Sequence, residues 1–173
     1  MRYGPCFDCP ATMLASSDRI LVATDFSPDG DKAVACGRDL AHRFGVETLV
    51  LHVCRETPES PGGPGAPLPE PLAACLASLR GRGLPARGLL RCGDPAALIL
   101  ETATRERASL IVLGARGEAR APGLLLGSVA DRVVRRATVP LLVVRRESSA
   151  DLAQQPGRGR SGEADRAEAQ SGA

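Results

Sequence analysis

Three glycines and a serine stand at fixed offsets in residues 114–128, GARGEARAPGLLLGS: they are Gly114, Gly117, Gly127 and Ser128. Glycine loses more conformational freedom on folding than any other residue, so a loop rich in glycine needs a compensating gain. Without Cβ atoms, the backbone N–H groups of such a loop can approach a phosphate closely. The spacing therefore predicts an anion-binding loop of the kind that holds the phosphate chain of a nucleotide.

The residues after this loop predict a helix whose start would complete the anion site. The stretch SVADRVVRRA (128–137) has helical periodicity, and Ser128 with Asp131 forms an S-x-x-D pattern typical of a helix N-cap. First-turn amides, including that of Val129, would face the ligand with the positive end of the helix dipole. Ser128 would cap the helix in either case, so a phosphate contact remains a second, open interpretation of it.

Apolar segments alternate with helical ones along the chain, and this alternation predicts the fold. Strands are expected at residues 19–24, 47–54, 86–93, 109–114 and 139–146, and helices at 28–44, 72–83, 95–107 and 128–137. Strands that are apolar throughout and alternate with helices indicate a parallel sheet covered on both faces. The fold class is therefore α/β: a single doubly wound, Rossmann-like domain with a five-stranded parallel sheet.

Helix ends are indicated by short polar signals. Ser27 is a good N-cap and Pro28 suits the first helical position, while Gly45 is typical of a helix end. Asp94 and Pro95 open a later helix in the same way. In a sheet of this class ligands bind beyond the carboxyl ends of the strands, where these helices begin.

Both ends of the chain differ from this domain. Residues 1–17 and 148–173 lack apolar periodicity, so we expect them to be disordered extensions of a domain that spans 18–147. Cys6 and Cys9 form a single C-x-x-C without a second pair at zinc-finger spacing. A disordered tail is therefore favoured there over a zinc or redox site.

Composition argues against several classes of protein. The 173 residues carry a net charge of +2, and aromatic residues make up 2%. So small a charge does not indicate a nucleic-acid or membrane surface, and platforms for stacking bases are nearly absent. Neither a transmembrane run nor a signal peptide is expected. We therefore expect a cytoplasmic protein with no nucleic-acid or membrane partner, and reduced thiols that act as small buried side chains at Cys36, Cys54, Cys75 and Cys92.

Other familiar motifs are excluded or need no ligand. A Walker A loop requires a Gly-Lys pair, which the chain lacks. The stretch GRGRSG (157–162) matches G-x-G-x-x-G, but no strand precedes it. His42 and His52 have no second histidine or carboxylate motif nearby, so structural roles are favoured for both.

The glycine pattern G-x2-G-x9-G-[ST] resembles the nucleotide-binding signature of the universal stress protein family. The likeness covers about residues 19–146 in the same order. ILVATDFS resembles the family's first strand and its Asp, TLVLHV its second strand, GDPAALILETATRERASLIVLGARG its Gly-x-Pro helix and fourth strand, and SVADRVVRRATVPLLVVR its closing helix and strand. The chain departs from common family sequences at Ala115, Arg116 and Ala130.

This resemblance implies an adenine nucleotide alpha hydrolase-like fold and a role for each residue at the ligand edge. Asp25 would accept hydrogen bonds from the ribose hydroxyls, unless it caps the following helix, and the backbone of Val53 would pair with the adenine edge. Gly114 would lie beside the ribose. The phosphates would be held by Gly117, Gly127, Ser128 and Val129. Ala23, Thr24 and Arg116 complete the expected set, although Arg116 can also simply be solvated.

The resemblance also implies a nucleotide-responsive stress protein of the ATP-binding type. Its expected ligand is ATP, ADP or AMP, with Mg²⁺ as a candidate companion of the phosphates, and its expected partner is a second copy of the chain. The apolar last strand, residues 139–144, would be an exposed edge in a monomer and would pair the two copies. Two other classes stay open: a scaffold that binds no nucleotide, and a weak ATPase or phosphotransferase. The enzyme ranks last because the loop offers no obvious base or metal-binding Asp.

Overall fold

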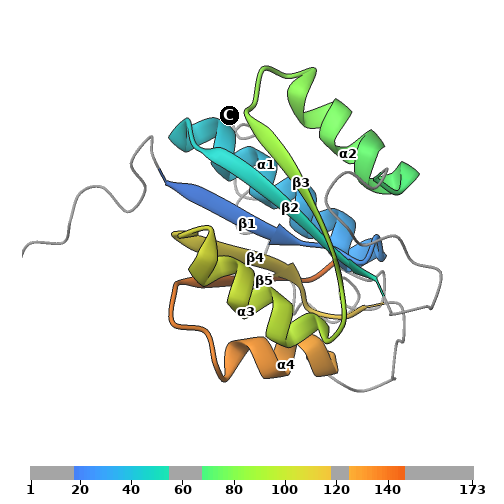
Figure 1. Cartoon of the computed structure of the whole chain (residues 1–173), viewed down its shortest axis with the longest axis vertical. Coiled ribbons are helices and arrows are strands. Elements are labelled where there is room, and N and C mark those ends of the chain that lie inside the picture. Colours follow the sequence, from blue (N-terminus) through green and yellow to red (C-terminus); the bar gives the residue numbers. More distant parts are fainter. Residues whose placement is uncertain (1–17, 55–67, 118–124, 147–173) are drawn as a thin grey trace, which may run out of the picture.

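The structure is a computed structural model that describes residues 18–54, 68–117 and 125–146. Its strands are β1 (Arg19–Ala23), β2 (Glu47–Cys54), β3 (Ala86–Cys92), β4 (Leu110–Gly114) and β5 (Leu141–Val144). Its helices are α1 (Pro28–Phe44), α2 (Glu70–Arg80), α3 (Pro95–Arg105) and α4 (Ser128–Val134). The five strands form one parallel sheet in the order β3-β2-β1-β4-β5 (Figure 1). The predicted α/β class and parallel sheet are confirmed.

Strand order reverses at β1. The chain runs from β1 to β2 and β3 on one side, and then crosses to β4 and β5 on the other. The place where the carboxyl ends of β1 and β4 lie side by side is the topological switch point of the sheet. Loops diverge there, so folds of this class bind their ligands there.

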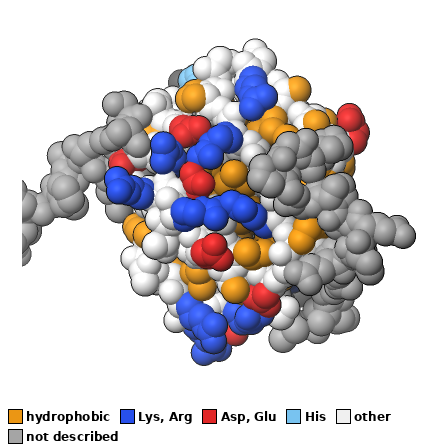
Figure 2. Space-filling view, in the orientation of Figure 1, with side chains coloured by type: hydrophobic (Ala, Val, Ile, Leu, Met, Phe, Trp, Pro, Cys, Tyr) orange, Lys and Arg blue, Asp and Glu red, His pale blue; other side chains and the backbone are white. Residues whose placement is uncertain are grey.

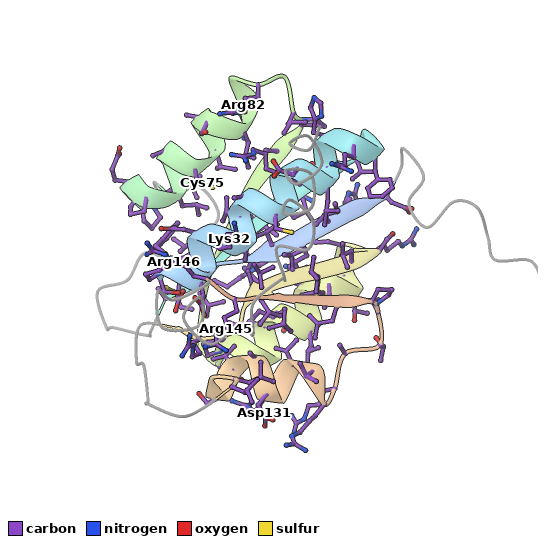
Figure 3. All side chains as sticks on the ribbon, turned by 180° about the vertical axis from the view of Figure 1, so that it is seen from behind. Lys32, Cys75, Arg82, Asp131, Arg145 and Arg146 are labelled. Carbon is purple, nitrogen blue, oxygen red and sulfur yellow. A yellow bond between two sulfur atoms is a disulfide. The ribbon has the colours of Figure 1, made fainter. Side chains whose placement is uncertain are left out.

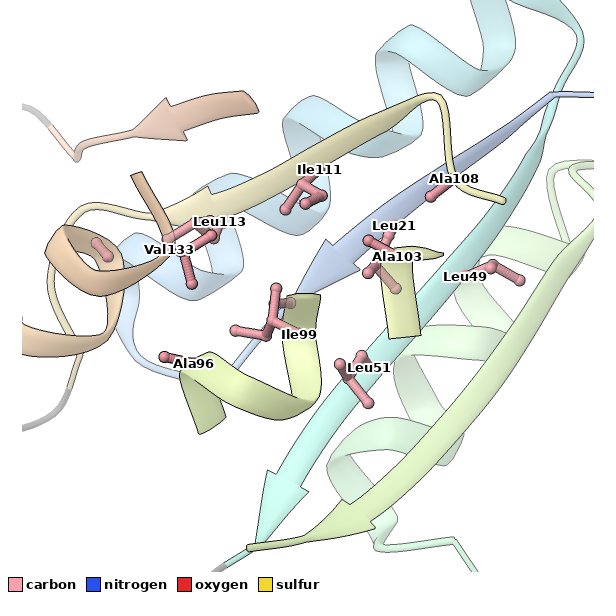
Figure 4. Close-up of a cluster of buried hydrophobic side chains, with 12 residues drawn as sticks. Leu21, Leu49, Leu51, Ala96, Ile99, Ala103, Ala108, Ile111, Leu113 and Val133 are labelled. Carbon is pink, nitrogen blue, oxygen red and sulfur yellow. The ribbon is translucent and has the colours of Figure 1, made fainter. Parts of the chain in front are cut away.

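Side chains along each strand alternate between two cores. Leu21, Leu49 and Ile111 are fully buried on the face that α3 and α4 cover, where Ile99 and Val133 meet them (Figure 4). The residues between them face the other way: Ile20, Val22 and Val112 pack against α1, and Val50 packs against α2. Because helices cover both faces, the strands carry apolar residues throughout instead of alternating with polar ones.

One predicted helix cap is wrong. The N-cap of α4 is Gly127, with φ −74° and ψ 163°, and among the described residues no side chain caps this helix. Ser128 is instead the first helical residue. The carboxylate of Asp131 accepts two hydrogen bonds from Arg135, each 3.0 Å long, because a charged partner one turn away competes with the backbone amides.

The cysteine prediction is also corrected. Cys54 and Cys92 form a disulfide between the ends of β2 and β3, where they are register partners with Cα atoms 4.8 Å apart. Cys36 and Cys75 are free thiols, and both are half-buried. Sequence reasoning missed the pair because the two residues are 38 positions apart and only the strand register brings them together.

Several predictions concern residues that the structure does not describe. The expected disorder of residues 1–17 and 148–173 lies outside the described residues, and so do Cys6 and Cys9. The domain limits at 18 and 147 therefore stay predictions. Among the described helices, none combines the length and the apolar character needed to cross a membrane. Figure 2 shows basic and acidic side chains interspersed on the face that α3 and α4 cover.

Candidate functional site at the switch point

The turn from β1 into α1 brings several polar groups to the carboxyl end of β1. The Thr24 hydroxyl accepts a hydrogen bond from the amide of Phe26 (3.0 Å), and Asp25 Oδ1 accepts one from the amide of Ser27 (3.1 Å). Ser27 Oγ accepts a bond from the amide of Gly30 (3.2 Å) and is the N-cap of α1, as predicted. Ser27, and not Asp25, is therefore the N-cap of α1, and the ribose role of Asp25 stays a prediction.

Phe26 holds this turn in an uncommon conformation. Its φ of 60° lies in the left-handed region, which costs a non-glycine residue about 1–3 kcal/mol, and residues strained in this way cluster at functional sites. The Phe26 ring packs against the ring of His52, with centroids 4.8 Å apart. His52 Nδ1 lies 2.9 Å from the carbonyl oxygen of Thr24, so this nitrogen carries the proton that it donates. The structural role predicted for His52 is thus to fix the turn that carries Asp25.

The glycine loop lies directly against this turn. Ser27 Oγ donates a hydrogen bond to the carbonyl of Arg116 (3.2 Å). A Cβ atom added to Gly117 would lie 2.5 Å from Asp25 Oδ2. Gly117 is not among the described glycines with positive φ, so close approach to the carboxylate, not backbone conformation, explains the missing side chain.

Gly114 and Gly127 have different surroundings. A Cβ atom on Gly114 would lie 2.7 Å from the backbone carbon of Asp29 and 2.8 Å from the nitrogen of Gly30. Glycine at 114 is therefore required so that α1 can begin next to β4. A Cβ atom on Gly127 would meet its neighbours at 3.5 Å or more, which is ordinary contact. The described packing gives no reason for glycine at 127.

The end of β2 borders the same corner. Its pairing with β1 ends at Ala23↔Leu51, whereas its pairing with β3 continues to Cys54↔Cys92. Among the described strands, Val53 therefore lies in a two-stranded extension past the last residue that β1 pairs. Backbone groups on the β1 side of such an extension are directed toward the switch point.

Arg116 has a buried partner. Its Nε lies 3.6 Å from Asp29 Oδ2, and the Asp29 side chain is 4% exposed. The other oxygen of Asp29 accepts a hydrogen bond from the amide of Arg146 (3.0 Å), which lies beside the start of α1 (Figure 3). Neither Asp29 Oδ2 nor Arg116 Nε has a hydrogen-bond partner among the described residues. Asp29 thus holds both the glycine loop and the end of β5 against α1.

Helix α4 is connected to α3 by an ion pair. Arg132 donates two hydrogen bonds to the Asp94 carboxylate, at 2.7 and 3.0 Å. Asp94 Oδ1 also accepts a bond from the amide of Ala97 (2.8 Å) and is the predicted N-cap of α3. The hydrogen bonds from Arg132, and then that from Ala97, hold the pKa of Asp94 below its ordinary value.

The expected site residues thus differ in their surroundings. Thr24, Asp25, Gly114, Arg116 and Gly117 converge at the switch point through the contacts given above, with Gly127 against the loop: its amide donates to the carbonyl of Ala115 (2.7 Å). Ser128 is exposed and Val129 half-buried in the first turn of α4, and Val53 is the residue before the last of β2. Ala23 differs, since it is buried in the core on the α3 side and only its backbone lies at the edge.

Sequence reasoning missed two residues that organise this corner. Phe26 gave no signal, because its residue type does not indicate a left-handed φ. Asp29 resembled an ordinary acidic residue of a first helical turn, and only its burial reveals its contacts with Arg116 and Arg146.

A doubly wound sheet with a polar turn and a glycine loop converging at its switch point belongs to the α/β class that takes ligands at this edge. The family model described as "Universal stress protein family" matches residues 16–145. The chain therefore belongs to the universal stress protein family.

Two curated relatives agree with this assignment. A Thermus aquaticus protein named "Universal stress protein in QAH/OAS sulfhydrylase 3'region" is 35% identical over 135 residues, which cover 73% of this chain and 97% of that protein. Universal stress protein Mb2028c of Mycobacterium bovis is 31% identical over 154 residues, which cover 79% of this chain and 52% of that protein. This chain thus spans about half the length of the mycobacterial relative.

Solved structures share the fold. That of hypothetical protein MJ0577 has a TM-score of 0.66 at 24% identity and covers 78% of this chain and 100% of its own. A universal stress protein described in complex with cAMP has a TM-score of 0.56 at 24% identity, covering 76% and 98%. One from Archaeoglobus fulgidus, described in complex with dAMP, has a TM-score of 0.54 at 20% identity, covering 76% and 99%. At these identities the likeness shows the fold alone.

Proposed function

We propose that this chain is a universal stress protein that binds an adenine nucleotide at the switch point and responds to it. The observation that carries the proposal is the contact between Gly117 and Asp25, where an added Cβ would lie 2.5 Å from Asp25 Oδ2. That contact joins the signature loop to the one carboxylate expected to bind ribose. The glycine loop and Asp25 were identified separately in the sequence, and a nucleotide bound between them would explain why both are present.

The described groups suit the three parts of a nucleotide. A carboxylate such as that of Asp25 accepts hydrogen bonds from ribose hydroxyls. The extension of β2 beyond Leu51 offers strand-edge backbone at Val53 for the donor and acceptor atoms of adenine. Phosphates would lie along the loop from Gly114 to Gly117, where side chains are absent, and against the residues that begin α4, with Thr24 and the Ala23 backbone forming the floor.

Charge at the phosphate end would come from Arg116. Its Nε lies 3.6 Å from Asp29 Oδ2 and has no hydrogen-bond partner among the described residues, so a phosphate oxygen would be a better acceptor for it. Mg²⁺ would be held mainly by phosphate oxygens and water, because the described residues contain no group of three His, Cys, Asp or Glu side chains that could hold a metal ion.

The number of phosphates is the finer part of the proposal. Two structural neighbours are described with adenine monophosphates, cAMP and dAMP. The loop signature is of the ATP-binding type, and its length suits a chain of phosphates. We therefore propose ATP as the principal ligand, with ADP and AMP as weaker ones, in a cytoplasmic protein.

We also propose that two copies pair through β5. This strand is the edge of the described sheet next to β4, and its residues Leu141–Val144 are half-buried and apolar. Folded proteins rarely leave such an edge unpaired. Analytical ultracentrifugation of the full chain should give a dimer, and a monomer at all concentrations would contradict this assembly.

The binding proposal is tested on the protein as purified. Mass spectrometry of the supernatant after denaturation identifies any adenine nucleotide carried from expression. Isothermal titration of the nucleotide-free chain with ATP, ADP and AMP then measures the three affinities, and we expect ATP to bind most tightly. If no nucleotide is carried and no titration gives heat, the binding function is wrong and a scaffold takes its place. Steady release of phosphate from ATP above the blank would instead indicate an enzyme.

A further inference from the structure

The Cys54–Cys92 disulfide lies at the same carboxyl edge as the proposed nucleotide site. Each cysteine is the last residue of its strand, and the ends of β2 and β3 lie side by side (Figure 1). Both cysteines are half-buried, whereas Leu51, three residues before Cys54, is fully buried. The bond is therefore at the rim of the sheet and not inside the fully buried core.

One set of contacts leads from the disulfide to the base and ribose end of the site. Cys54 directly follows Val53, whose backbone is proposed to meet adenine. His52, one residue earlier, is bonded to the carbonyl of Thr24 (2.9 Å), next to Asp25. Because β1 does not pair with β2 beyond Leu51, the strand pairing that supports this segment comes from β3, and the disulfide joins the two strand ends.

A second set of contacts leads to the phosphate end. Gly93 follows Cys92 with φ 135°, and its amide donates to the carbonyl of Cys54 (3.3 Å). The next residue, Asp94, is the N-cap of α3 and binds Arg132 of α4. The position of α4, and with it the position of Ser128, therefore depends on the same end of β3.

The structure also offers a hydrogen-bond partner for the reduced Cys54 thiol. The Cys54 sulfur lies 3.2 Å from the carbonyl oxygen of Arg91, which can accept a hydrogen bond from a thiol S–H. Of the two free cysteines, Cys75 on α2 has a raised pKa, because of its burial and then the charge of Asp31. A raised pKa disfavours the reactive thiolate, so Cys75 is a poor competitor in thiol exchange.

We propose that Cys54 and Cys92 form a reversible redox pair that sets the affinity of the neighbouring nucleotide site; this rests on the proposed function. In the disulfide form, the ends of β2 and β3 are held in the conformation that meets the ligand. In the dithiol form they are less ordered, and ligand binding has to order them, which weakens the observed affinity. Disulfides are uncommon in a reducing compartment unless they are transient or redox-sensing, which fits a pair of this kind.

The chemistry is thiol–disulfide exchange with a cellular dithiol. A thiolate of the reductant attacks one sulfur of the pair, forms a mixed disulfide and releases the other sulfur as a thiolate. The second thiol of the reductant then displaces the remaining protein sulfur. The reductant leaves as a disulfide, and Cys54 and Cys92 each gain one electron and one proton. Oxidation is the reverse exchange with a disulfide oxidant.

The test compares the full chain in its oxidised and dithiol-reduced forms, whose states are verified by thiol alkylation and intact mass. ATP affinity is measured by isothermal titration, and amide hydrogen exchange is followed in residues 50–54 and 90–94. We expect reduction to weaken ATP binding by about threefold to tenfold and to speed exchange in both segments.

Matched double variants separate the pair from the other thiols. Cys54→Ala/Cys92→Ala should bind ATP like the reduced wild type and should not respond to reductant. Cys36→Ala/Cys75→Ala should keep the full response. Equal affinity and equal exchange in the oxidised and reduced wild type would overturn the proposal. If ATP binds in neither state, the nucleotide function is wrong and the affinity claim with it, while faster exchange on reduction would still support a redox pair that orders this edge.

Discussion

Helices α1 and α4 begin at the same carboxyl edge of the sheet, and their first residues have very different surroundings. At α1, the Ser27 side chain caps the helix, Pro28 occupies its first turn and Asp29 is buried with contacts to two other segments. At α4, the N-cap is Gly127 and no described side chain caps the helix, while Ser128 is exposed.

This difference separates residues that the fold needs from residues that a ligand needs. The start of α1 is part of the packing of the domain: it contacts β4 at Gly114 and the glycine loop at Arg116. The start of α4 makes fewer such contacts with the described residues. Substitutions at α1, and at Gly114, which packs against it, should therefore change stability first, whereas substitutions at α4 and at Gly117 should change nucleotide affinity first.

The largest expected change in stability is that of Gly114→Ala. Its Cβ would lie 2.7 Å from the backbone of Asp29, which no side-chain rotation can relieve, so α1 must move away from β4. We expect the free energy of unfolding to fall by about 2 kcal/mol. The matched change is Gly127→Ala, where φ is −74° and contacts are ordinary, and its stability should stay within about 0.5 kcal/mol of wild type. Urea unfolding of both measures this, and equal losses would contradict the comparison.

The second prediction concerns nucleotide affinity in Gly117→Ala. In Gly117→Ala the Cβ would meet the end of a flexible side chain, Asp25 Oδ2 at 2.5 Å, so the carboxylate turns away and the fold survives. We expect the affinity for ATP to fall about tenfold, the worth of one or two charge-assisted hydrogen bonds. Titration of Gly117→Ala, Asp25→Ala and the double variant completes a cycle. Because both changes act on one carboxylate, the double variant should lose less than the sum, and full additivity would show that they act separately.

A smaller change in stability should distinguish Ser27 from Ser128. Ser27→Ala removes the acceptor for the Gly30 amide and the donor to the Arg116 carbonyl, and we expect a loss of about 1 kcal/mol in the free energy of unfolding. Ser128→Ala removes no cap, so stability should change by less than about 0.5 kcal/mol while ATP affinity falls. Thermal unfolding and titration of both variants measure this. A loss of stability at Ser128 as large as that at Ser27 would mean that Ser128 caps α4 in solution.

Much of the fold could be predicted because local signals and burial agree. The predicted span of β2, 47–54, matches Glu47–Cys54, and α1 runs from its Ser27 cap to Gly45, which has the left-handed φ of 67° expected of a helix end. Such signals depend on neighbouring residues along the chain, which the sequence contains in full.

What could not be predicted depends on register and on competing partners. Cys54 meets Cys92 only because β2 and β3 pair with one particular offset. Ser128 and Asp131 have the spacing of a cap, but Arg135 removes the carboxylate from that role. Likewise, the sequence indicated Asp25 and Gly117 as separate parts of a site, and the pairing of β1 with β4 brings them into contact.

The smallest expected effect is on the pH dependence of stability, through the ion pair that connects α4 to α3. The hydrogen bonds of Arg132, and then that of the Ala97 amide, lower the pKa of Asp94, so the folded protein binds this proton less readily than the unfolded chain. The stabilisation is therefore present above the ordinary carboxyl pKa and is lost as the pH falls through the lower folded value. Asp94→Asn keeps an oxygen that can accept from Ala97 but removes the charge, so its stability should fall less steeply with acid than that of wild type. Urea midpoints across the acidic range measure the slopes, and Arg132→Gln should flatten the slope in the same way. If both variants keep the wild-type slope, α4 is held by its apolar contacts alone.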